Sequence, residues 1–243
     1  MFELVKGTQA ASLYIAKEAD DFAGLSHVAE KIQKDIELVT GVAPKICDAM
    51  PEGYSIIPGT IGKNPVIDEM IANGKLNVSQ LDGKRESYAL CLVDGDKLVI
   101  AGTETVATLH GMYHISEKIG VSPWVYWGDA IPRKQAEIVW DESIEFTSKE
   151  PSVKFRGFFM NDEWPSLGNF VMNTFGDFNV KFYDRVFDLL LRLKGNYFWP
   201  AMWSASLCLD GSKEDPLANV KLATDLGLSL IHISEPTRHL RIS

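Results

Sequence analysis

Two apolar runs separated by one amphipathic segment constrain the fold of the second part of this chain. Val153–Met160 (V-K-F-R-G-F-F-M) is nearly continuous in apolar residues, a pattern typical of a strand buried on both faces of a parallel sheet. Phe182–Lys194 has apolar residues at helical spacing and is followed by Gly195. Asn196–Trp203 (N-Y-F-W-P-A-M-W) predicts the next strand and its exit. Strand, helix and strand with short links indicate parallel βα units.

A further helix extends this series. Asp215-Pro216 predicts its start, with Asp as the N-cap and Pro at the first helical position, and Gly227 predicts its end. Repeated βα units begin a (β/α)8 barrel, a fold that needs about 250 residues. Residues 151–227 have room for roughly two such units. We therefore expect the first βα units of an incomplete, truncated TIM barrel.

Residues 1–150 are predicted to form a separate N-terminal α/β domain. Helices are expected after Ser26 and from Thr105 onward. The polar segment Trp140–Ser152 marks the boundary between the domains. Three runs predict strands, and the last two are joined by a hairpin signal: Ser12–Ala16, Tyr88–Val93 and Lys97–Gly102.

Several residues in the first part could suggest ligand sites, but their patterns are incomplete. Gly59 and Gly62 follow a predicted strand without the Lys-Ser/Thr pair of a phosphate loop. His110 and His114 share a helix face without a visible third ligand, which favours packing over metal binding. The three cysteines lie far apart and are interpreted as free thiols. We expect no metal or organic cofactor.

The charge and hydropathy of the chain bear on its partners. The formal net charge is −9 over 243 residues, without a basic run, so we expect no nucleic acid and no anionic membrane surface as a partner. No apolar run reaches the ~20 residues of a membrane span. The N-terminal M-F-E-L-V-K-G lacks a signal-peptide pattern. We expect a cytoplasmic protein, with an exported or periplasmic one as the alternative if Met1 is not the true start.

Polar and aromatic side chains follow both predicted strands of the second part. Asn161, Asp162 and Glu163 end the first strand, and Trp199 and Trp203 lie at the end of the second. Since reactive groups of a barrel lie at the carboxyl ends of its strands, we expect both groups on one face. Carboxylates and amides bind pairs of sugar hydroxyls, and an indole stacks on a pyranose ring, so this set indicates a carbohydrate. Helix capping and core packing are an equally open interpretation.

Asp162 and Glu163 are a poor acid–base pair. Adjacent residues of an extended strand point to opposite faces, so both cannot face one substrate. Glycoside hydrolysis usually uses two carboxyl groups, about 5–5.5 Å apart for retention and about 6.5–9.5 Å apart for inversion. Residues 151–227 therefore offer one of the two at best, and a later strand would have to supply the other.

The end of the sequence has a foreign character. Leu228–Arg238 (L-S-L-I-H-I-S-E-P-T-R) matches what one reading frame of a common transposase sequencing adapter encodes. We therefore expect residues 228–243 to be an artefactual tail. The triad-like residues His232, Ser234, Glu235 and His239 are given no function.

Long runs of the chain closely resemble glycoside hydrolase family 115. They are Ser152–Pro165, Phe182–Trp203 and Asp215–Gly227, and Leu98–Glu104 and His110–Asp129 look like that family's N-terminal domain. The family contains xylan α-glucuronidases, which remove α-1,2-linked glucuronic acid or its 4-O-methyl ether with inversion. The resemblance implies a parent enzyme acting on glucuronoxylan or glucuronoxylo-oligosaccharides, with a homodimer as a candidate assembly. We expect this truncated chain to be inactive alone. The alternative is a non-catalytic carbohydrate-binding protein.

The resemblance also implies roles for the site residues. Asp162 is expected in the active-site pocket as a catalytic residue, with Asn161 and Glu163 beside it as substrate-binding residues. Trp203 and Trp199 are expected to line the uronic acid site. The family's His-His-Glu-Pro element at the third strand is replaced here by the predicted tail. Its general-acid glutamate and the basic residues that pair with the uronate lie further along the barrel and are absent from this chain.

Overall fold

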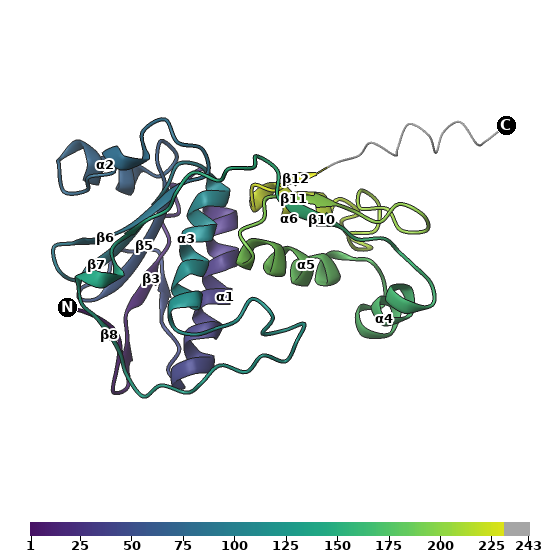
Figure 1. Ribbon diagram of the computed structural model, residues 1–243, viewed down its shortest axis with the longest axis horizontal. Coiled ribbons are helices and arrows are strands. Elements are labelled where there is room, and N and C mark those ends of the chain that lie inside the picture. Colours follow the sequence, from purple (N-terminus) through teal and green to yellow (C-terminus); the bar gives the residue numbers. More distant parts are fainter. Residues whose placement is uncertain (231–243) are drawn as a thin grey trace. The chain divides into compact units, whose positions relative to one another are not determined.

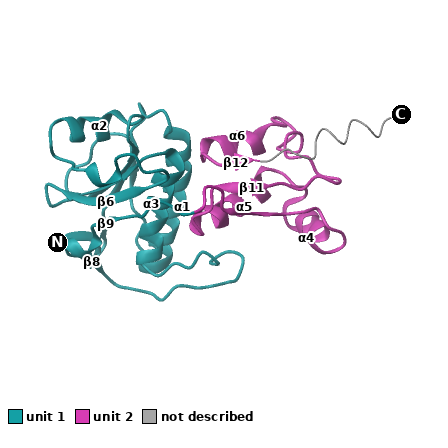
Figure 2. Cartoon of the chain, turned by 45° about the horizontal axis from the view of Figure 1, so that its top comes forward, with its two compact units in different colours: residues 1–152 teal, residues 153–243 magenta. Residues whose placement is uncertain are grey.

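In the computed structural model, residues 1–230 are described, and the chain divides into two compact units (Figures 1 and 2). The first is Met1–Ser152 and the second is Val153–Ser243. The division at Ser152 falls two residues after the boundary expected at 150. The part of the predicted tail from residue 231 onward lies outside the described residues.

The first unit is built on a six-stranded mixed sheet of order β4-β3-β5-β7-β6-β9. Strands β4, β3, β5 and β7 pair in parallel, β6 pairs antiparallel with β7, and β9 pairs antiparallel with β6. The bounds are β3 (Ser12–Tyr14), β4 (Ile46–Cys47), β5 (Ser55–Thr60), β6 (Tyr88–Val93), β7 (Lys97–Gly102) and β9 (Phe146–Thr147). The predicted hairpin is confirmed at its predicted bounds.

A smaller antiparallel sheet and three α-helices complete this unit. The sheet has the order β2-β1-β8, with β1 (Phe2–Lys6), β2 (Gln9–Ala10) and β8 (Ile138–Trp140). The helices are α1 (Phe22–Thr40), α2 (Pro65–Ala72) and α3 (Thr105–Lys118), and two 3-10 turns are Ser79–Leu81 and Glu142–Ile144. Helices α1 and α3 lie side by side against the large sheet (Figure 1).

Glycines allow the elements of this unit to approach closely. A Cβ on Gly111 of α3 would lie 2.5 Å from Ile100 Cγ2 in β7. A Cβ on Gly59 would lie 2.4 Å from Ile67 Cγ1, and one on Gly102 would lie 2.3 Å from Thr108 Oγ1. Gly59 therefore serves close packing at the carboxyl end of β5, where an open phosphate loop would have needed space.

The second unit contains three parallel strands in the order β10-β11-β12. They are β10 (Gly157–Phe159), β11 (Tyr197–Trp199) and β12 (Ser229–Leu230), and the helices are α4 (Ser166–Phe175), α5 (Val180–Arg192) and α6 (Ala218–Asp225). Helix α5 follows β10 after α4, and α6 lies between β11 and β12 in the chain. The expected parallel βα series is confirmed, and with it the α/β class of the chain.

Three expectations from the sequence were wrong in detail, and one helix was missed. The predicted buried strand Val153–Met160 is reduced to β10, in which Gly157 and Phe159 are exposed. Helix α4 was not predicted. Helix α1 begins at Phe22, four residues before Ser26. Helix α6 begins at Ala218, because the predicted N-cap Asp215 instead forms a turn in which Ala218 N donates to its carbonyl oxygen.

The third strand includes the first residues of the predicted tail. Ser229 pairs with Tyr197 and Leu230 pairs with Phe198, while Leu228 is buried. The parallel sheet therefore continues past Leu228, where the expected tail begins. Residues 231–243 are outside the described part.

The core of the second unit is rich in aromatic rings. Tyr183 and Phe187 of α5 pack against Phe198 of β11, with ring centroids 5.9 and 5.5 Å apart, respectively. All three side chains are almost fully buried. Edge-to-face pairs of this kind add roughly 0.5–1.5 kcal/mol each to the stabilisation from area burial. The pairs fix α5 against the strand whose carboxyl end carries the candidate site.

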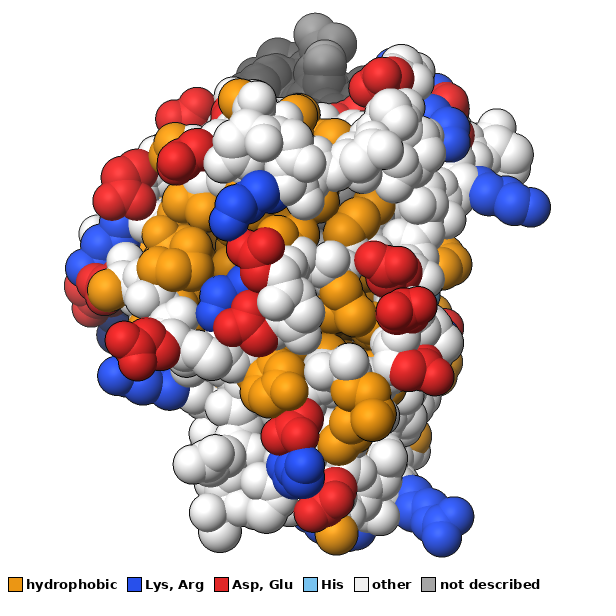
Figure 3. All heavy atoms as spheres, turned by 90° about the vertical axis from the view of Figure 1, so that its left-hand side faces the viewer, with side chains coloured by type: hydrophobic (Ala, Val, Ile, Leu, Met, Phe, Trp, Pro, Cys, Tyr) orange, Lys and Arg blue, Asp and Glu red, His pale blue; other side chains and the backbone are white. Residues whose placement is uncertain are grey.

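Charged side chains of both signs lie on the surface of the described part. On the face that Figure 3 shows, acidic and basic side chains are interspersed with hydrophobic ones. Within residues 1–230, no helix combines the length and the hydropathy needed to cross a bilayer.

The N-cap of α5 gives a test of this fold. Asn179 Oδ1 accepts hydrogen bonds from the amides of Lys181 and Phe182. Replacing Asn179 by Ala should therefore lower the free energy of unfolding of the second unit by about 1 kcal/mol. Urea titration measures the loss, and hydrogen exchange of the two amides locates it. Asn179→Asp keeps the acceptor but loses the bond that Nδ2 donates to Phe175 O, so it should recover part of the stability. Equal losses in the two variants would contradict the cap.

Candidate functional site

The expected meeting of polar and aromatic residues is found at the carboxyl ends of β10 and β11. The two strands pair in parallel, with Phe159 opposite Trp199. Met160 N donates to Trp199 O at 3.0 Å, which extends the ladder by one bond. The residues that follow β10 and those that follow β11 therefore leave the sheet at the same edge.

Asp162 is buried at this edge and binds the segment that follows β11. Its side chain is 2% exposed. Oδ1 accepts a hydrogen bond from Trp203 N at 3.1 Å. Oδ2 accepts from Ser204 N, from Ser204 Oγ at 2.6 Å and from Ala205 N at 2.8 Å. One carboxylate therefore binds three consecutive main-chain amides and a hydroxyl, which fixes the conformation of residues 203–205.

The hydrogen bonds determine the ionisation of Asp162. Burial alone would raise the pKa of its carboxyl group, but the bonds from Ser204, Ala205 and Trp203 outweigh burial and lower the pKa to about 2. At neutral pH the group is a carboxylate whose oxygens are engaged. It therefore has no proton to donate to a leaving group, and this geometry favours an anchoring role over proton transfer.

Asn161 and Glu163 lie on either side of this anchor. Asn161 Nδ2 donates to Glu163 Oε1 at 2.6 Å. Asn161 Oδ1 is buried and has no hydrogen-bond partner in the described residues, whereas Glu163 is exposed. As expected for adjacent residues, Asp162 and Glu163 point into different surroundings. The amide of Asn161 retains an acceptor for a hydroxyl group of a ligand or for a water molecule.

The two tryptophans differ in exposure. Trp199 is half-buried and packs against Phe159, with ring centroids 5.3 Å apart. Its Nε1 donor is buried without an acceptor in the described residues. Trp203 is 68% exposed, on the segment that Asp162 fixes. The site thus combines a donor, an acceptor, a carboxylate and an exposed indole face, which are groups that suit a hydroxylated ring.

Two residues of this site were missed at the level of sequence. Ser204 donates to Asp162 through both its amide and its hydroxyl, and Tyr183 places a buried hydroxyl, which has no partner in the described part, in the aromatic core below. Burial raises the pKa of the Tyr183 hydroxyl above its ordinary value. The only local signal was a serine following the aromatic run, which is too common to single out. Among residues 1–230, no cluster of three metal-ligating side chains is found.

Comparison with known proteins agrees with the resemblance seen in the sequence. Residues 148–236 match the sequence profile described as "Glycosyl hydrolase family 115". The matched range contains the whole candidate site and continues beyond residue 227. The resemblance to glycoside hydrolase family 115 is thereby confirmed. No curated protein matches the chain.

Solved structures show the extent of the likeness. A family GH115 4-O-methyl-α-glucuronidase with specificity for decorated arabinogalactans is 27% identical and superposes with a TM-score of 0.77. The match covers 94% of this chain but 29% of that enzyme, so this chain corresponds to less than a third of its length. A mutant β-hexosaminidase from Streptomyces plicatus in complex with GlcNAc is 13% identical, with a TM-score of 0.47, over 95% of this chain and 42% of that one. The second likeness is too weak to support a functional statement.

The low pKa of Asp162 predicts a pH-dependent contribution to stability. Because the folded-state pKa of about 2 lies below the unfolded value of about 3.9, ionised Asp162 stabilises the fold above about pH 4. This contribution is lost as the pH falls from about 4 through about 2. Asp162→Asn should therefore cost about 2 kcal/mol at pH 7. The difference in the free energy of unfolding between this variant and the unmodified chain should shrink toward pH 2.

Urea titrations of both proteins between pH 2 and pH 7 measure this difference. Asp215→Asn is the matched control, since the Asp215 side chain is 39% exposed and its pKa is lowered chiefly by a hydrogen bond from Lys221. That variant should change the stability far less than Asp162→Asn. A pH-independent loss in Asp162→Asn would show that the ionised carboxylate is not what holds residues 203–205.

Proposed function

We propose that the protein containing this chain is an inverting α-glucuronidase that removes glucuronic acid or its 4-O-methyl ether from glucuronoxylan or its oligosaccharides. The observation that carries the proposal is the family match over residues 148–236, which includes the polar and aromatic residues at the ends of β10 and β11. A structural neighbour that is a 4-O-methyl-α-glucuronidase supports the same activity.

In this proposal, β10 and β11 are the first strands of a (β/α)8 barrel, and β12, formed by Ser229 and Leu230 of the expected tail, occupies the position of the third. Their parallel order and the helices α5 and α6 between them support it. The ends of these strands would form one side of the sugar pocket. Later strands would supply the remaining side, as in barrels whose catalytic groups come from the ends of several strands.

Each site residue has a proposed role that follows from its contacts. Trp203 stacks on the sugar, because its indole is exposed and its main chain is fixed by Asp162. Trp199 donates from Nε1, and Asn161 accepts at Oδ1. Glu163 accepts from a hydroxyl while it holds Asn161. Asp162, predicted to be catalytic, is proposed as a residue that positions the loop carrying Trp203.

An inverting hydrolysis needs one carboxylic acid to protonate the leaving oxygen and one carboxylate to activate water. No cofactor is required for these steps. Within the described residues, Asp162 is fully engaged, and Glu163 is bonded to Asn161. We therefore propose that the general acid and base lie outside this chain, and that the 243-residue chain releases no uronic acid by itself. A cytoplasmic location stays the expectation, with export as its alternative.

A second substrate is favoured by one observation. The structural neighbour is described as specific for decorated arabinogalactans. The uronic acid and its linkage would then be recognised as proposed, on a galactan backbone instead of a xylan backbone. The residues of the described site contact the uronic acid in our proposal, so they do not separate the two backbones.

The proposal is tested by incubating the longer protein that contains this chain with glucuronoxylan and with glucuronic acid-decorated arabinogalactan. Released uronic acid is followed by NMR, which also identifies the anomer formed first. Release as the β-anomer supports inversion at an α-linkage, and release as the α-anomer contradicts it. Binding of either polysaccharide without any release would favour the alternative of a carbohydrate-binding protein.

The role of Trp203 gives a quantitative prediction. Trp203→Ala should weaken binding of a glucuronoxylo-oligosaccharide by about tenfold, because a tryptophan at the centre of a binding site typically contributes more than about 1 kcal/mol. NMR titration or calorimetry measures the affinity. Trp124→Ala is the matched control, since Trp124 is 49% exposed in the first unit and should leave the affinity unchanged. Equal losses in the two variants would remove Trp203 from the site.

A further inference from the structure

A cavity in the first unit is separate from the site at the ends of β10 and β11. It has a volume of about 310 Å³ and lies between the β1–β2 hairpin, the start of β3 and the segment before β5. Six residues with polar groups line it: Glu3, Lys6, Gln9, Ser12, Glu52 and Tyr54. The volume is at the lower end of the range of about 300–1,000 Å³ that is usual for small-molecule sites. One or two sugar rings are of this size.

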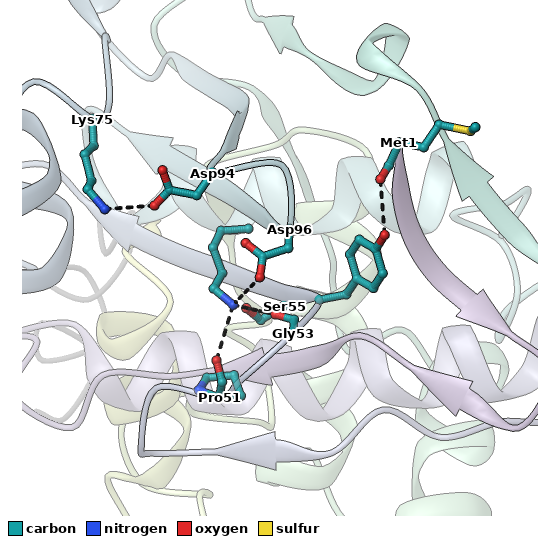
Figure 4. A network of polar contacts seen from close by, with 9 residues as sticks. Met1, Pro51, Gly53, Ser55, Lys75, Asp94 and Asp96 are labelled. Atoms are coloured by element: carbon teal, nitrogen blue, oxygen red, sulfur yellow. Dashed lines mark hydrogen bonds and ion pairs between the residues drawn. The ribbon is translucent and has the colours of Figure 1, made fainter.

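The wall formed by residues 51–54 is held in place by a partly buried ammonium group. Lys97 Nζ donates to Pro51 O at 3.3 Å and to Gly53 O, and it pairs with Asp96 at 3.1 Å (Figure 4). The Lys97 side chain is 15% exposed. Charge-assisted bonds to two carbonyl oxygens restrict this segment before any ligand binds. A pre-formed wall lowers the entropy that binding would otherwise cost.

Two hydrogen bonds, one between main-chain groups and one from a side chain, join this wall to the rest of the cavity. Ser12 N donates to Tyr54 O at 3.0 Å, and Tyr54 OH donates to Met1 O at 3.5 Å. The Tyr54 ring meets the ring of Phe2 edge-on, with centroids 5.5 Å apart. The aromatic side chain is thereby fixed at the border of the cavity, where it can present apolar surface to a ring.

The polar side chains of the lining keep their binding capacity. In the described part of the chain, the side chains of Gln9, Ser12 and Glu52 take part in no hydrogen bond or ion pair. Lys6 Nζ pairs with Glu3 Oε1 at 2.6 Å. An amide, a hydroxyl and a carboxylate can donate to and accept from neighbouring hydroxyl groups, and this is the arrangement that sugar rings present.

The charge of the lining selects among sugars. Two carboxylates face one ammonium, so the lining has an excess negative charge of one, from Glu3, Glu52 and Lys6. The ammonium is already paired with Glu3. A uronic acid would bring its own carboxylate close to Glu52 without a free cation from the lining, and like charges repel. The lining therefore favours a neutral sugar.

We propose that this cavity binds one or two neutral sugar residues, such as those of a polysaccharide backbone. The inference rests on the proposed function, which makes a polysaccharide the substrate, but it concerns a second site that does not take the uronic acid. Such a site would hold the backbone on the first unit and increase the local concentration of substrate for the second.

The test uses the full chain carrying Trp203→Ala, so that the proposed uronic acid site is weakened. Xylobiose and galactobiose are the neutral probes, and glucuronic acid is the charged probe. Binding is followed by the NMR shifts of the backbone amides of residues 3–12 and 52–54. We expect a Kd on the order of 1 mM for at least one neutral probe, and no shifts at these amides with glucuronic acid.

Variants of the lining decide whether the cavity is the binding site. Glu52→Ala and Gln9→Ala should each raise the Kd about five- to tenfold, because each removes a hydrogen bond to the sugar. Lys97→Met should weaken binding by releasing the wall without removing a lining group. Lys75→Gln is the matched control, since Lys75 forms an exposed pair with Asp94 outside the lining (Figure 4) and should leave the Kd unchanged.

Three results would overturn this inference: no shift with either neutral probe, an unchanged Kd in both lining variants, or equal binding of glucuronic acid at these amides. None of them depends on release of uronic acid, so a failure here is distinguishable from a failure of the proposed activity. Conversely, the outcome to compare is that the longer protein releases no uronic acid while this chain binds a neutral probe. That pair of results would contradict the proposed activity and would still support the cavity site.

Discussion

The carboxylate of Asp162 is the interaction on which the candidate site depends. It accepts hydrogen bonds from the main-chain amides of Trp203, Ser204 and Ala205 and from the Ser204 hydroxyl. An ionised acceptor on three consecutive amides forms stronger bonds than a neutral one, and it satisfies donors that burial would otherwise leave unpaired. It therefore fixes the part of the segment after β11 that presents the exposed indole of Trp203.

This interaction requires the parallel pairing of β10 and β11. Asp162 follows β10 by three residues, and its partners follow β11 by four to six residues. Only strands that run in the same direction bring both exits to one edge. The aromatic contacts of α5 with Phe198 hold β11 at its position, so the hydrophobic core below the sheet and the polar anchor at its edge stabilise each other.

Local patterns in the sequence were enough to predict some of these elements. The β6–β7 hairpin was predicted at its observed bounds because Asp94-Gly95 lies between two β-rich runs, and Asp94 and Gly95 adopt positive φ values of 55° and 81°. The start of α1 was missed because Gly24 lowers helix propensity in the first turn, which is held instead by the fully buried Leu25.

The site was only partly predictable for a different reason. That polar residues follow both strands is visible in the sequence, and their meeting at one edge follows from parallel pairing. The partners of Asp162, however, lie 41–43 residues away along the chain, and no local pattern connects them. The resemblance implied a catalytic residue, whereas these long-range contacts support the proposal that Asp162 anchors residues 203–205.

Both candidate sites use one charged side chain to hold a segment by its main chain. Asp162 binds amides after β11, and Lys97 binds the carbonyl oxygens of Pro51 and Gly53 before β5. A bond from a side chain to the backbone orders one side chain, whereas a bond between two side chains orders two, so less conformational entropy is lost. Asp162 bonds to Trp203 through the main-chain amide, and Lys97 bonds to residues 51 and 53 through their carbonyl oxygens. The indole of Trp203 and the carboxylate of Glu52 take no part in these main-chain bonds, and both lie exposed where a ligand can reach them.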